Sequence, residues 1–122
     1  MNRLITWLDL PAADLARAQV FYRALLGPSA RVEARGGVVV IGPPDGPVEA
    51  RLIHRPEGGA PGPLPYFRLR HPLETALARV EELGGRILEL PHPIPPYGRR
   101  ALIRDSEGNT IALYREAPDE GG

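Results

Sequence analysis

The feature that most constrains how this 122-residue chain can fold is an internal repeat of one helix pattern. Apolar residues recur at helical spacing over Leu15–Leu26, and the same spacing returns over Leu73–Leu83. The two stretches align at a constant separation of 58 positions, so that Gly27 after the first corresponds to Gly85 after the second. Such a repeat indicates two copies of one supersecondary unit. A chain of this length has room for one shared core, so we expect a single domain made of two modules.

Short apolar runs predict the strands that surround each helix. In the first module they are Arg3–Leu10, Arg31–Ala34, Val38–Ile41 and Val48–Ile53, with Asp14 as the N-cap of the helix. In the second they are Tyr66–Leu69, Arg86–Leu90, Ala101–Ile103 and Ile111–Tyr114, with His71-Pro72 opening the helix. The expected fold class is α+β, with two tandem βαβββ modules. Their limits are about 1–56 and about 65–117, with a linker at 57–64 and a disordered tail at 118–122.

Breaker and turn residues set the expected ends of these elements. Arg3–Leu10 is apolar on both faces, which suits the interior of a sheet, and Pro11 is expected to end it. The four prolines of Pro91–Gly98 predict a loop. Asp105–Asn109 is expected to be a hairpin turn, because Asp105 can accept backbone N–H bonds and Gly108 or Asn109 can adopt a positive φ.

The composition excludes several classes of function. Fifteen acidic residues balance fifteen basic ones, so no net charge marks a nucleic-acid partner or an anionic membrane surface. No apolar run reaches the length of a transmembrane helix, and a cytoplasmic location is the default expectation. The sequence contains neither Cys nor Lys. This excludes thiolate nucleophiles and Cys-ligated metals, together with Lys bases and Schiff-base chemistry.

Several motifs together resemble one family. They are Asp14-Leu-Ala-Arg-Ala18 with Phe21-Tyr22 and Gly27, then Val80-Glu-Glu-Leu-Gly-Gly85, Ile94-Pro95, Gly98-Arg99 and Asp105-Ser-Glu-Gly108-Asn109. This combination is similar to the vicinal oxygen chelate superfamily over nearly the whole chain. That group contains glyoxalase I (lactoylglutathione lyase), the bleomycin-resistance proteins and the extradiol dioxygenases. The resemblance implies that the modules form a cupped mixed sheet with the helices outside, and it does not select a reaction.

The resemblance also implies where metal ligands would lie. Enzymes of that superfamily place His and Glu ligands for a divalent metal inside the cup, on the first and last strands of each module. The matching positions here are Trp7 and Arg51 in the first module and Tyr66 and Ala112 in the second. These side chains cannot hold a divalent metal, so we expect no metal cofactor. The alternative is a divalent metal bound by relocated ligands drawn from Asp9, Glu49, His54 and His92.

Strand alternation predicts which side chains fill the cup instead. Leu8 and Leu10 are expected to face a helix, so their neighbours face the other way. The face away from the helices is expected to carry Trp7, Asp9, Glu49, Arg51, Tyr66, Arg68 and Tyr114. Guanidinium groups beside aromatic rings suit a small anionic or aromatic ligand. The alternative is a solvated face or a dimer interface, with Asp9–Arg51 or Glu49–Arg68 as structural ion pairs.

The proline-rich segment Pro91–Arg100 is a second candidate for ligand binding. Tyr97 and Arg99 in this segment offer ring stacking and anion contacts. The alternative is a rigid connector whose prolines protect a strand edge from pairing. The three histidines, His54, His71 and His92, show no metal-ligand spacing and are interpreted as bystanders, with His71 at a helix entry. Both serines lie in predicted turns, so a Ser-His nucleophile is not expected.

Three functions remain open at this stage. The first is binding of a small molecule without the usual metal, or metal-free catalysis with Asp9 as a general acid–base residue. Its expected ligand-binding residues are Trp7, Asp9, Arg51, Tyr66, Arg68, Tyr97, Arg99 and Tyr114. The second is a metal-dependent lyase, isomerase or dioxygenase with relocated ligands. The third is an antibiotic-sequestering protein, although an Arg-containing cup suits a cationic drug poorly. A homodimer is expected, because half-cups leave sheet edges and a concave face open.

Overall fold

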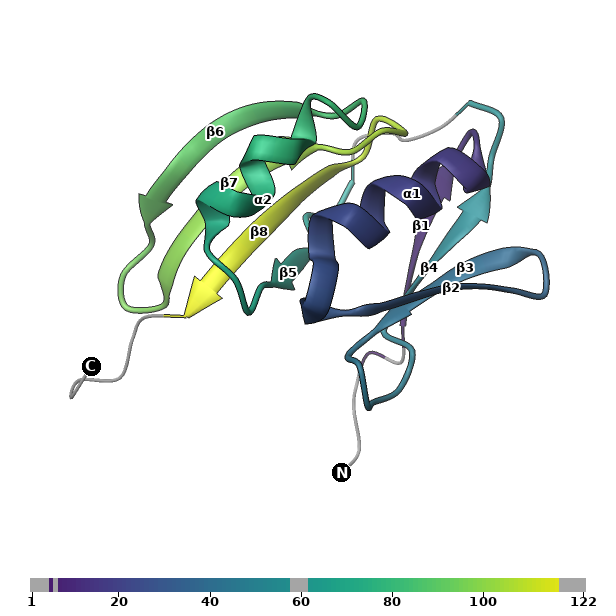
Figure 1. Ribbon diagram of the computed structural model, residues 1–122, viewed down its shortest axis with the longest axis horizontal. Helices are drawn as coiled ribbons and strands as arrows, with labels where there is room; N and C mark the ends of the chain where they lie inside the picture. The colour runs from purple at the N-terminus through teal and green to yellow at the C-terminus, as the bar shows by residue number, and fades with distance from the viewer. Residues whose placement is uncertain (1–4, 6, 58–61, 117–122) are drawn as a thin grey trace.

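The computed structural model describes residue 5 and residues 7–57 and 62–116 (Figure 1). The first module contains β1 (Leu8–Ala12), α1 (Leu15–Leu26), the short 3-10 helix η1 (Gly27–Ser29), β2 (Arg31–Arg35), β3 (Val38–Gly42) and β4 (Ala50–His54). The second contains β5 (Tyr66–Arg68), α2 (Leu73–Val80), β6 (Arg86–Pro93), β7 (Gly98–Arg104) and β8 (Thr110–Glu116). The expected tail at 118–122 and residues 58–61 of the expected linker at 57–64 lie outside the described residues.

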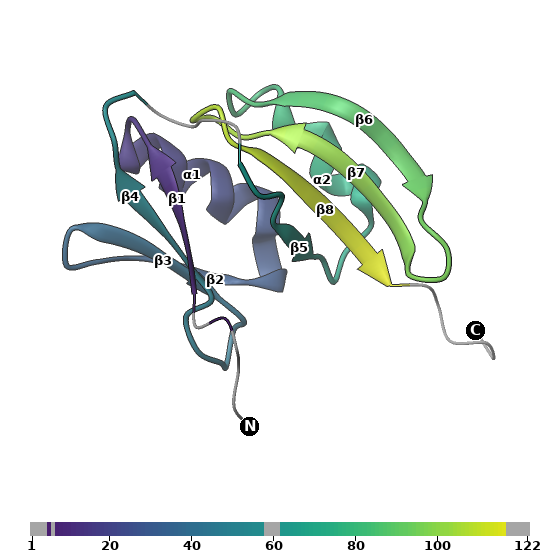
Figure 2. The same ribbon diagram turned by 180° about the vertical axis from the view of Figure 1, so that it is seen from behind.

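Each module forms its own four-stranded mixed sheet. The strand orders are β1-β4-β3-β2 and β5-β8-β7-β6. In the first sheet β1 pairs in parallel with β4, and in the second sheet β5 pairs in parallel with β8. Figure 2 shows the two sheets side by side with both helices behind them. The α+β class and the tandem βαβββ arrangement predicted from the sequence are therefore confirmed.

Helix α1 begins and ends where the sequence predicts. Asp14 is extended and its carboxylate accepts the N–H of Arg17 at 3.0 Å, which satisfies one of the free donors of the first turn. Gly27 ends the helix with φ 48°, a conformation that side chains rarely adopt. The apolar stripe of the helix is fully covered and consists of Ala18, Phe21, Tyr22, Leu25 and Leu26.

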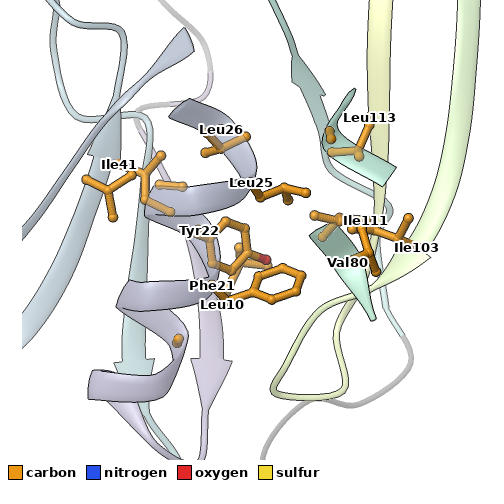
Figure 3. Packing of buried hydrophobic residues seen from close by; sticks show 14 of the residues in the cluster. Leu10, Phe21, Tyr22, Leu25, Leu26, Ile41, Val80, Ile103, Ile111 and Leu113 are labelled. Atoms are coloured by element: carbon orange, nitrogen blue, oxygen red, sulfur yellow. The ribbon is translucent and has the colours of Figure 1, made fainter. Parts of the chain in front are cut away.

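The two modules share one hydrophobic core. Phe21, Tyr22 and Leu25 of α1 point toward Val80, Ile103 and Ile111 of the second module (Figure 3). The rings of Tyr22 and Phe67 lie 5.7 Å apart and join α1 to β5. The buried residues of the two modules thus form one continuous cluster.

The hairpin turn between β7 and β8 carries buried polar side chains that bond to the first module. Asp105, Glu107 and Asn109 are all buried. The carboxylate of Glu107 accepts the backbone N–H of Asp14 at 2.9 Å and two hydrogen bonds from Arg17, each 2.8 Å long. Asn109 donates to the carbonyl of Pro11 at 2.8 Å. The turn therefore fixes the start of α1 against the second module.

Two expectations about prolines are wrong, for one physical reason. β1 continues through Pro11 to Ala12, and β6 continues through Pro91 to Pro93 instead of giving way to a loop. Both are edge strands of their sheets, so β1 also does not lie in a sheet interior. An edge strand leaves one row of N–H positions unpaired, and proline fits there. The register of β6 against β7 also shifts twice, which accommodates the irregular backbone.

The second helix is shorter than its apolar pattern suggests. α2 ends at Val80, and a turn carries the chain past Leu83 to the glycines. Among the described residues, no helix is both long enough and apolar enough to cross a membrane.

Candidate functional site

The face of the first sheet that lies away from α1 carries a compact charged group. Arg51 donates two hydrogen bonds to Asp9, at 2.8 and 2.9 Å, from the neighbouring strand. The same guanidinium lies 5.1 Å from the ring centroid of Trp7. The hydrogen bonds from Arg51 lower the pKa of Asp9 below its ordinary 3.8, with a smaller contribution from Trp7. Asp9 is therefore an ion-pair partner at neutral pH, and a role as general base would require Arg51 to move.

The corresponding face of the second sheet carries an aromatic and cationic row. The strand register places Arg68, Tyr114, Arg100 and His92 side by side on β5, β8, β7 and β6. The next row contains Tyr66 directly opposite Ala112. Ala112 has a small side chain, so the larger neighbours converge over it.

Tyr66, Arg68 and Tyr114 of these rows border a pocket of about 440 Å³. Its lining is Tyr66, Arg68, Ile94, Tyr97 and Tyr114. The rings of Tyr66 and Tyr114 meet edge to face, 6.4 Å apart. The hydroxyl of Tyr114 donates to the backbone carbonyl of Tyr97 and so holds the β6–β7 loop over the sheet. The pocket therefore has aromatic walls from two strands and one loop, with a guanidinium at its rim.

Arg100 connects the side chains beside this pocket. Its guanidinium donates to the hydroxyl of Tyr66 and lies 5.9 Å from the centroid of that ring. Its Nε donates to His92 Nε2 at 3.3 Å, and it lies 3.9 Å from the carboxylate of Glu89. A permanent positive charge is thus fixed next to the phenol of Tyr66.

The structure groups the expected ligand-binding residues into two sets. Trp7, Asp9 and Arg51 form one set on the first sheet, and Tyr66, Arg68, Tyr97 and Tyr114 form the other on the second. Within the described part of the chain, no hydrogen bond, ion pair or ring contact joins the two sets.

Arg99 is not brought into either set. It lies on the helix side of β7 and donates to Glu74 of α2 at 2.9 Å. Its neighbour Arg100 lies on the opposite face of the sheet, away from α2. The sequence contained a signal for this choice, because Ala101 and Ile103 are the buried residues of β7 and strand alternation then separates Arg99 from Arg100. Sequence reasoning also missed Ile94, whose place in the pocket depends on the path of the loop.

Glu49 lies apart from the expected cup as well. It lines a cavity of about 470 Å³ at the junction of the modules, together with Tyr66 and Arg68, which also line the first pocket. The nearby Ser29 hydroxyl lies 3.1 Å from His71 Nδ1 and accepts the N–H of Arg70 at 2.8 Å. These contacts join η1 to the entry of α2, which agrees with the interpretation of His71 as a helix-entry residue.

The residues at the implied metal positions do not fit a divalent metal. Trp7 lies against Arg51, and Tyr66 pairs with Ala112, so the two strand pairs meet as the resemblance implies but without a carboxylate or an imidazole. No group of three His, Cys, Asp or Glu side chains among the described residues is arranged to hold a metal ion. Of the possible relocated ligands, Asp9 is engaged by Arg51 and His92 by Arg100.

Comparisons with known proteins agree with this geometry. The family model of the Glyoxalase/Bleomycin resistance protein/Dioxygenase superfamily matches residues 4–113. The anthracycline biosynthesis protein DauV of Streptomyces sp. (strain C5) is 28% identical over 132 residues, covering 94% of this chain and 48% of DauV. The chain thus spans about half the length of the curated relatives that it matches.

Solved structures show the same fold at low sequence identity. A glyoxalase/bleomycin resistance protein from Albidiferax ferrireducens T118 superposes with a TM-score of 0.75 at 20% identity, covering 94% of this chain and 100% of that one. The fosfomycin resistance protein FosX from Mesorhizobium loti gives 0.66 at 16% identity, with coverage of 99% and 98%.

The element order and the two mixed sheets define a protein of paired βαβββ modules. The chain belongs to the Glyoxalase/Bleomycin resistance protein/Dioxygenase superfamily.

Proposed function

We propose that this protein binds a small, planar, anionic or phenolic aromatic molecule between Tyr66, Tyr97 and Tyr114, without the divalent metal that is usual in its superfamily. The observation that carries the proposal is the pocket of about 440 Å³ with three tyrosines and Arg68 in its lining. Aromatic walls favour a flat ring by stacking, and a guanidinium at the rim favours a negatively charged oxygen.

Guanidinium groups on both sheets support a ligand with a negatively charged oxygen. Arg51 is paired with Asp9, and Arg68 lies 3.5 Å from the exposed carboxylate of Glu116, so a ligand anion would compete with these partners. Arg51 stands where the resemblance places a metal-binding carboxylate in the first module, and Arg100 lies over the corresponding region of the second. A guanidinium keeps its charge at all physiological pH values and has only donors. The metal in related enzymes attracts ligand oxygens, and a fixed guanidinium attracts the same atoms through hydrogen bonds.

The curated relatives support a fused aromatic ring as the first probe. DauV carries the name of an anthracycline biosynthesis protein, and anthracyclines contain planar fused rings. Isothermal titration of the protein with 2-naphthoate and with anthraquinone-2-sulfonate would test the proposal directly. We expect saturable binding of at least one of these anions.

Two variants locate the binding site. Arg68→Gln should weaken binding of these anions by about tenfold, because one charge-assisted hydrogen bond is lost. Arg79→Gln is the matched control, since Arg79 is exposed on α2, and it should leave the affinity unchanged. No binding of either anion by the wild-type protein, or equal losses in the two variants, would contradict the proposal.

The metal-free part of the proposal has its own test. Metal analysis of protein purified without a His tag should find less than stoichiometric Zn, Ni, Fe and Mn. Added divalent metal should also leave the melting temperature unchanged, because a metal that binds only the folded state would raise it. A stoichiometric metal would favour the alternative of a metal-dependent enzyme with relocated ligands.

We also propose that the protein is a homodimer. The free edges β1 and β5 and the exposed side chains of Trp7 and Tyr66, which are 49% and 48% accessible, suit contact with a second copy. Light scattering at micromolar concentration should give twice the mass of the chain. A monomeric mass at that concentration would contradict this assembly.

A further inference from the structure

The geometry points to Tyr66 as the hydrogen-bond donor that selects ligands with an oxygen acceptor, with Arg100 and His92 as its positioning residues. The inference rests on the proposed function of the pocket and deepens it. It names the ligand class as aromatic molecules whose carboxylate, phenolate or quinone oxygen lies against the Tyr66 hydroxyl.

The direction of the Arg100–Tyr66 hydrogen bond follows from the chemistry of the two groups. A guanidinium has only donors, so Arg100 donates and the phenolic oxygen of Tyr66 accepts. The hydrogen of the Tyr66 hydroxyl is then left over. It has no acceptor among the residues that the structure describes, and Tyr66 belongs to the lining of the pocket. Tyr66 therefore offers a free O–H to a ligand.

Arg100 is itself held in place by a histidine in a defined state. His92 Nδ1 lies 2.9 Å from the carbonyl of Leu90, which requires a hydrogen on Nδ1. His92 Nε2 accepts the Nε–H of Arg100 at 3.3 Å, which requires a lone pair on Nε2. The two contacts together place the ring hydrogen on Nδ1 and the lone pair on Nε2, which also lies 3.6 Å from the carboxylate of Glu89, beyond hydrogen-bond distance. Leu90 and His92 thus fix Arg100 from the backbone of the edge strand.

The other two phenols of the pocket are not equivalent to Tyr66. The hydroxyl of Tyr114 uses its hydrogen on the carbonyl of Tyr97, so it has none to donate to a ligand. The side chain of Tyr97 is 66% exposed, and no partner orients its hydroxyl among the described residues. Tyr66 alone of the three combines an orienting partner with a free hydrogen.

The positive charge of Arg100 strengthens this donor. A hydrogen bond that a phenol accepts from a cation polarises its own O–H, so the next hydrogen bond in the chain becomes stronger. The chain of hydrogen bonds through Leu90, His92, Arg100 and Tyr66 ends at the pocket. A negatively charged ligand oxygen there accepts the strengthened hydrogen bond from Tyr66 most favourably. A ligand without such an oxygen gains only the stacking contacts.

Titration of three proteins with two probes separates these contributions. The proteins are the wild type, Tyr66→Phe and Arg79→Gln, and the probes are 2-naphthoate and 2-methylnaphthalene, which share a ring system but differ in the acceptor. Tyr66→Phe should weaken 2-naphthoate by about tenfold and 2-methylnaphthalene by less than about twofold. Arg79→Gln, at an exposed position of α2, should change neither affinity by more than about twofold.

The outcomes distinguish this inference from the proposed function. If the wild type binds 2-naphthoate and Tyr66→Phe weakens both probes equally or neither, the donor role is wrong while the pocket stands. If the wild type binds neither 2-naphthoate nor anthraquinone-2-sulfonate, the proposed function fails, and the donor role with it.

A readout without ligand tests the positioning residues. ¹⁵N chemical shifts of the His92 ring should show the hydrogen on Nδ1, and Arg100→Gln should weaken this preference while the contact of Nδ1 with the Leu90 carbonyl remains. An Nε2-protonated ring in the wild type would exclude the hydrogen bond from Arg100 and overturn the inference.

Discussion

The hydroxyl of Tyr22 donates to Oδ2 of Asp105 at 2.6 Å, and this hydrogen bond joins α1 of the first module to the hairpin turn of the second. Oδ1 of the same carboxylate accepts the backbone N–H groups of Glu107 and Asn109, each at 2.8 Å. Burial raises the pKa of Tyr22 well above its ordinary value, and the negative charge of Asp105 acts in the same direction. The phenol therefore stays protonated and serves as a permanent donor between the modules.

Tyr22→Phe should destabilise the protein by about 1–3 kcal/mol, because a buried carboxylate loses one donor while the ring packing stays. Urea unfolding followed by circular dichroism measures the change. Tyr97→Phe is the matched control, since its side chain is 66% exposed, and it should stay within about 0.5 kcal/mol of the wild type. Equal stability of the two variants would show that the Tyr22 hydroxyl does not hold the modules together.

Glu107 should make the stability depend on pH in the acid range. Burial by itself would raise the pKa of its carboxyl group, but hydrogen bonds from Arg17, Ser106 and the Asp14 N–H outweigh it and lower the pKa from 4.5 to about 2. The unfolded chain then binds this proton more tightly than the folded one. The contribution is complete above pH 4.5 and is lost as the pH falls toward 2.

The size of this contribution follows from the separation of the two pKa values. A difference of about 2.5 pH units corresponds to at most about 3 kcal/mol, and the half-exposed Arg17 reduces it to about 1–3 kcal/mol. Urea unfolding gives the free energy of unfolding of the wild type and of Glu107→Gln at pH 7 and at pH 2.5. The contribution of Glu107 is the loss on acidification in the wild type minus the loss in the variant. If the two proteins lose the same stability on acidification, Glu107 is not the group responsible.

Gly85→Ala should disturb the contact between the modules. An added Cβ would lie 2.6 Å from the carbonyl oxygen of Arg104 and 2.8 Å from the ring of Phe21. The backbone cannot yield as a flexible side chain would, so we expect a loss of about 1–3 kcal/mol. Gly62→Ala is the control, because nothing lies within 4 Å of its added Cβ. Thermal unfolding of both variants is the measurement, and an unchanged midpoint for Gly85→Ala would contradict the close packing.

Trp7 should report on the charge state of Asp9. It is the single tryptophan of the chain, and its ring lies against Arg51, which is paired with Asp9. Because hydrogen bonds from Arg51 lower the pKa of Asp9, its protonation and the release of Arg51 should change Trp7 emission only below pH 3.8. Asp9→Asn should show no such transition while circular dichroism reports folded protein. A transition centred above that pH in the wild type would argue against the ion pair.

The sequence by itself determined the local elements and the family of folds. Asp14 caps α1 and Gly27 ends it because capping depends on neighbours along the chain. The hairpin turn at Asp105–Asn109 also forms as its residue types predict. The side chains of Trp7, Arg51, Tyr66 and Tyr114 could be assigned to one type of face because strand alternation is a local rule.

Tertiary structure decided the features that depend on which strand lies at an edge and on contacts across the chain. Pro11 and Pro91 fit into strands only because β1 and β6 are edges, and the sequence does not state the strand order. The contacts of Tyr66 with Arg100 span 34 positions, and those of Glu107 with Arg17 span 90. Local patterns specify conformation and facing, whereas such partners meet only when the core has brought the two modules together.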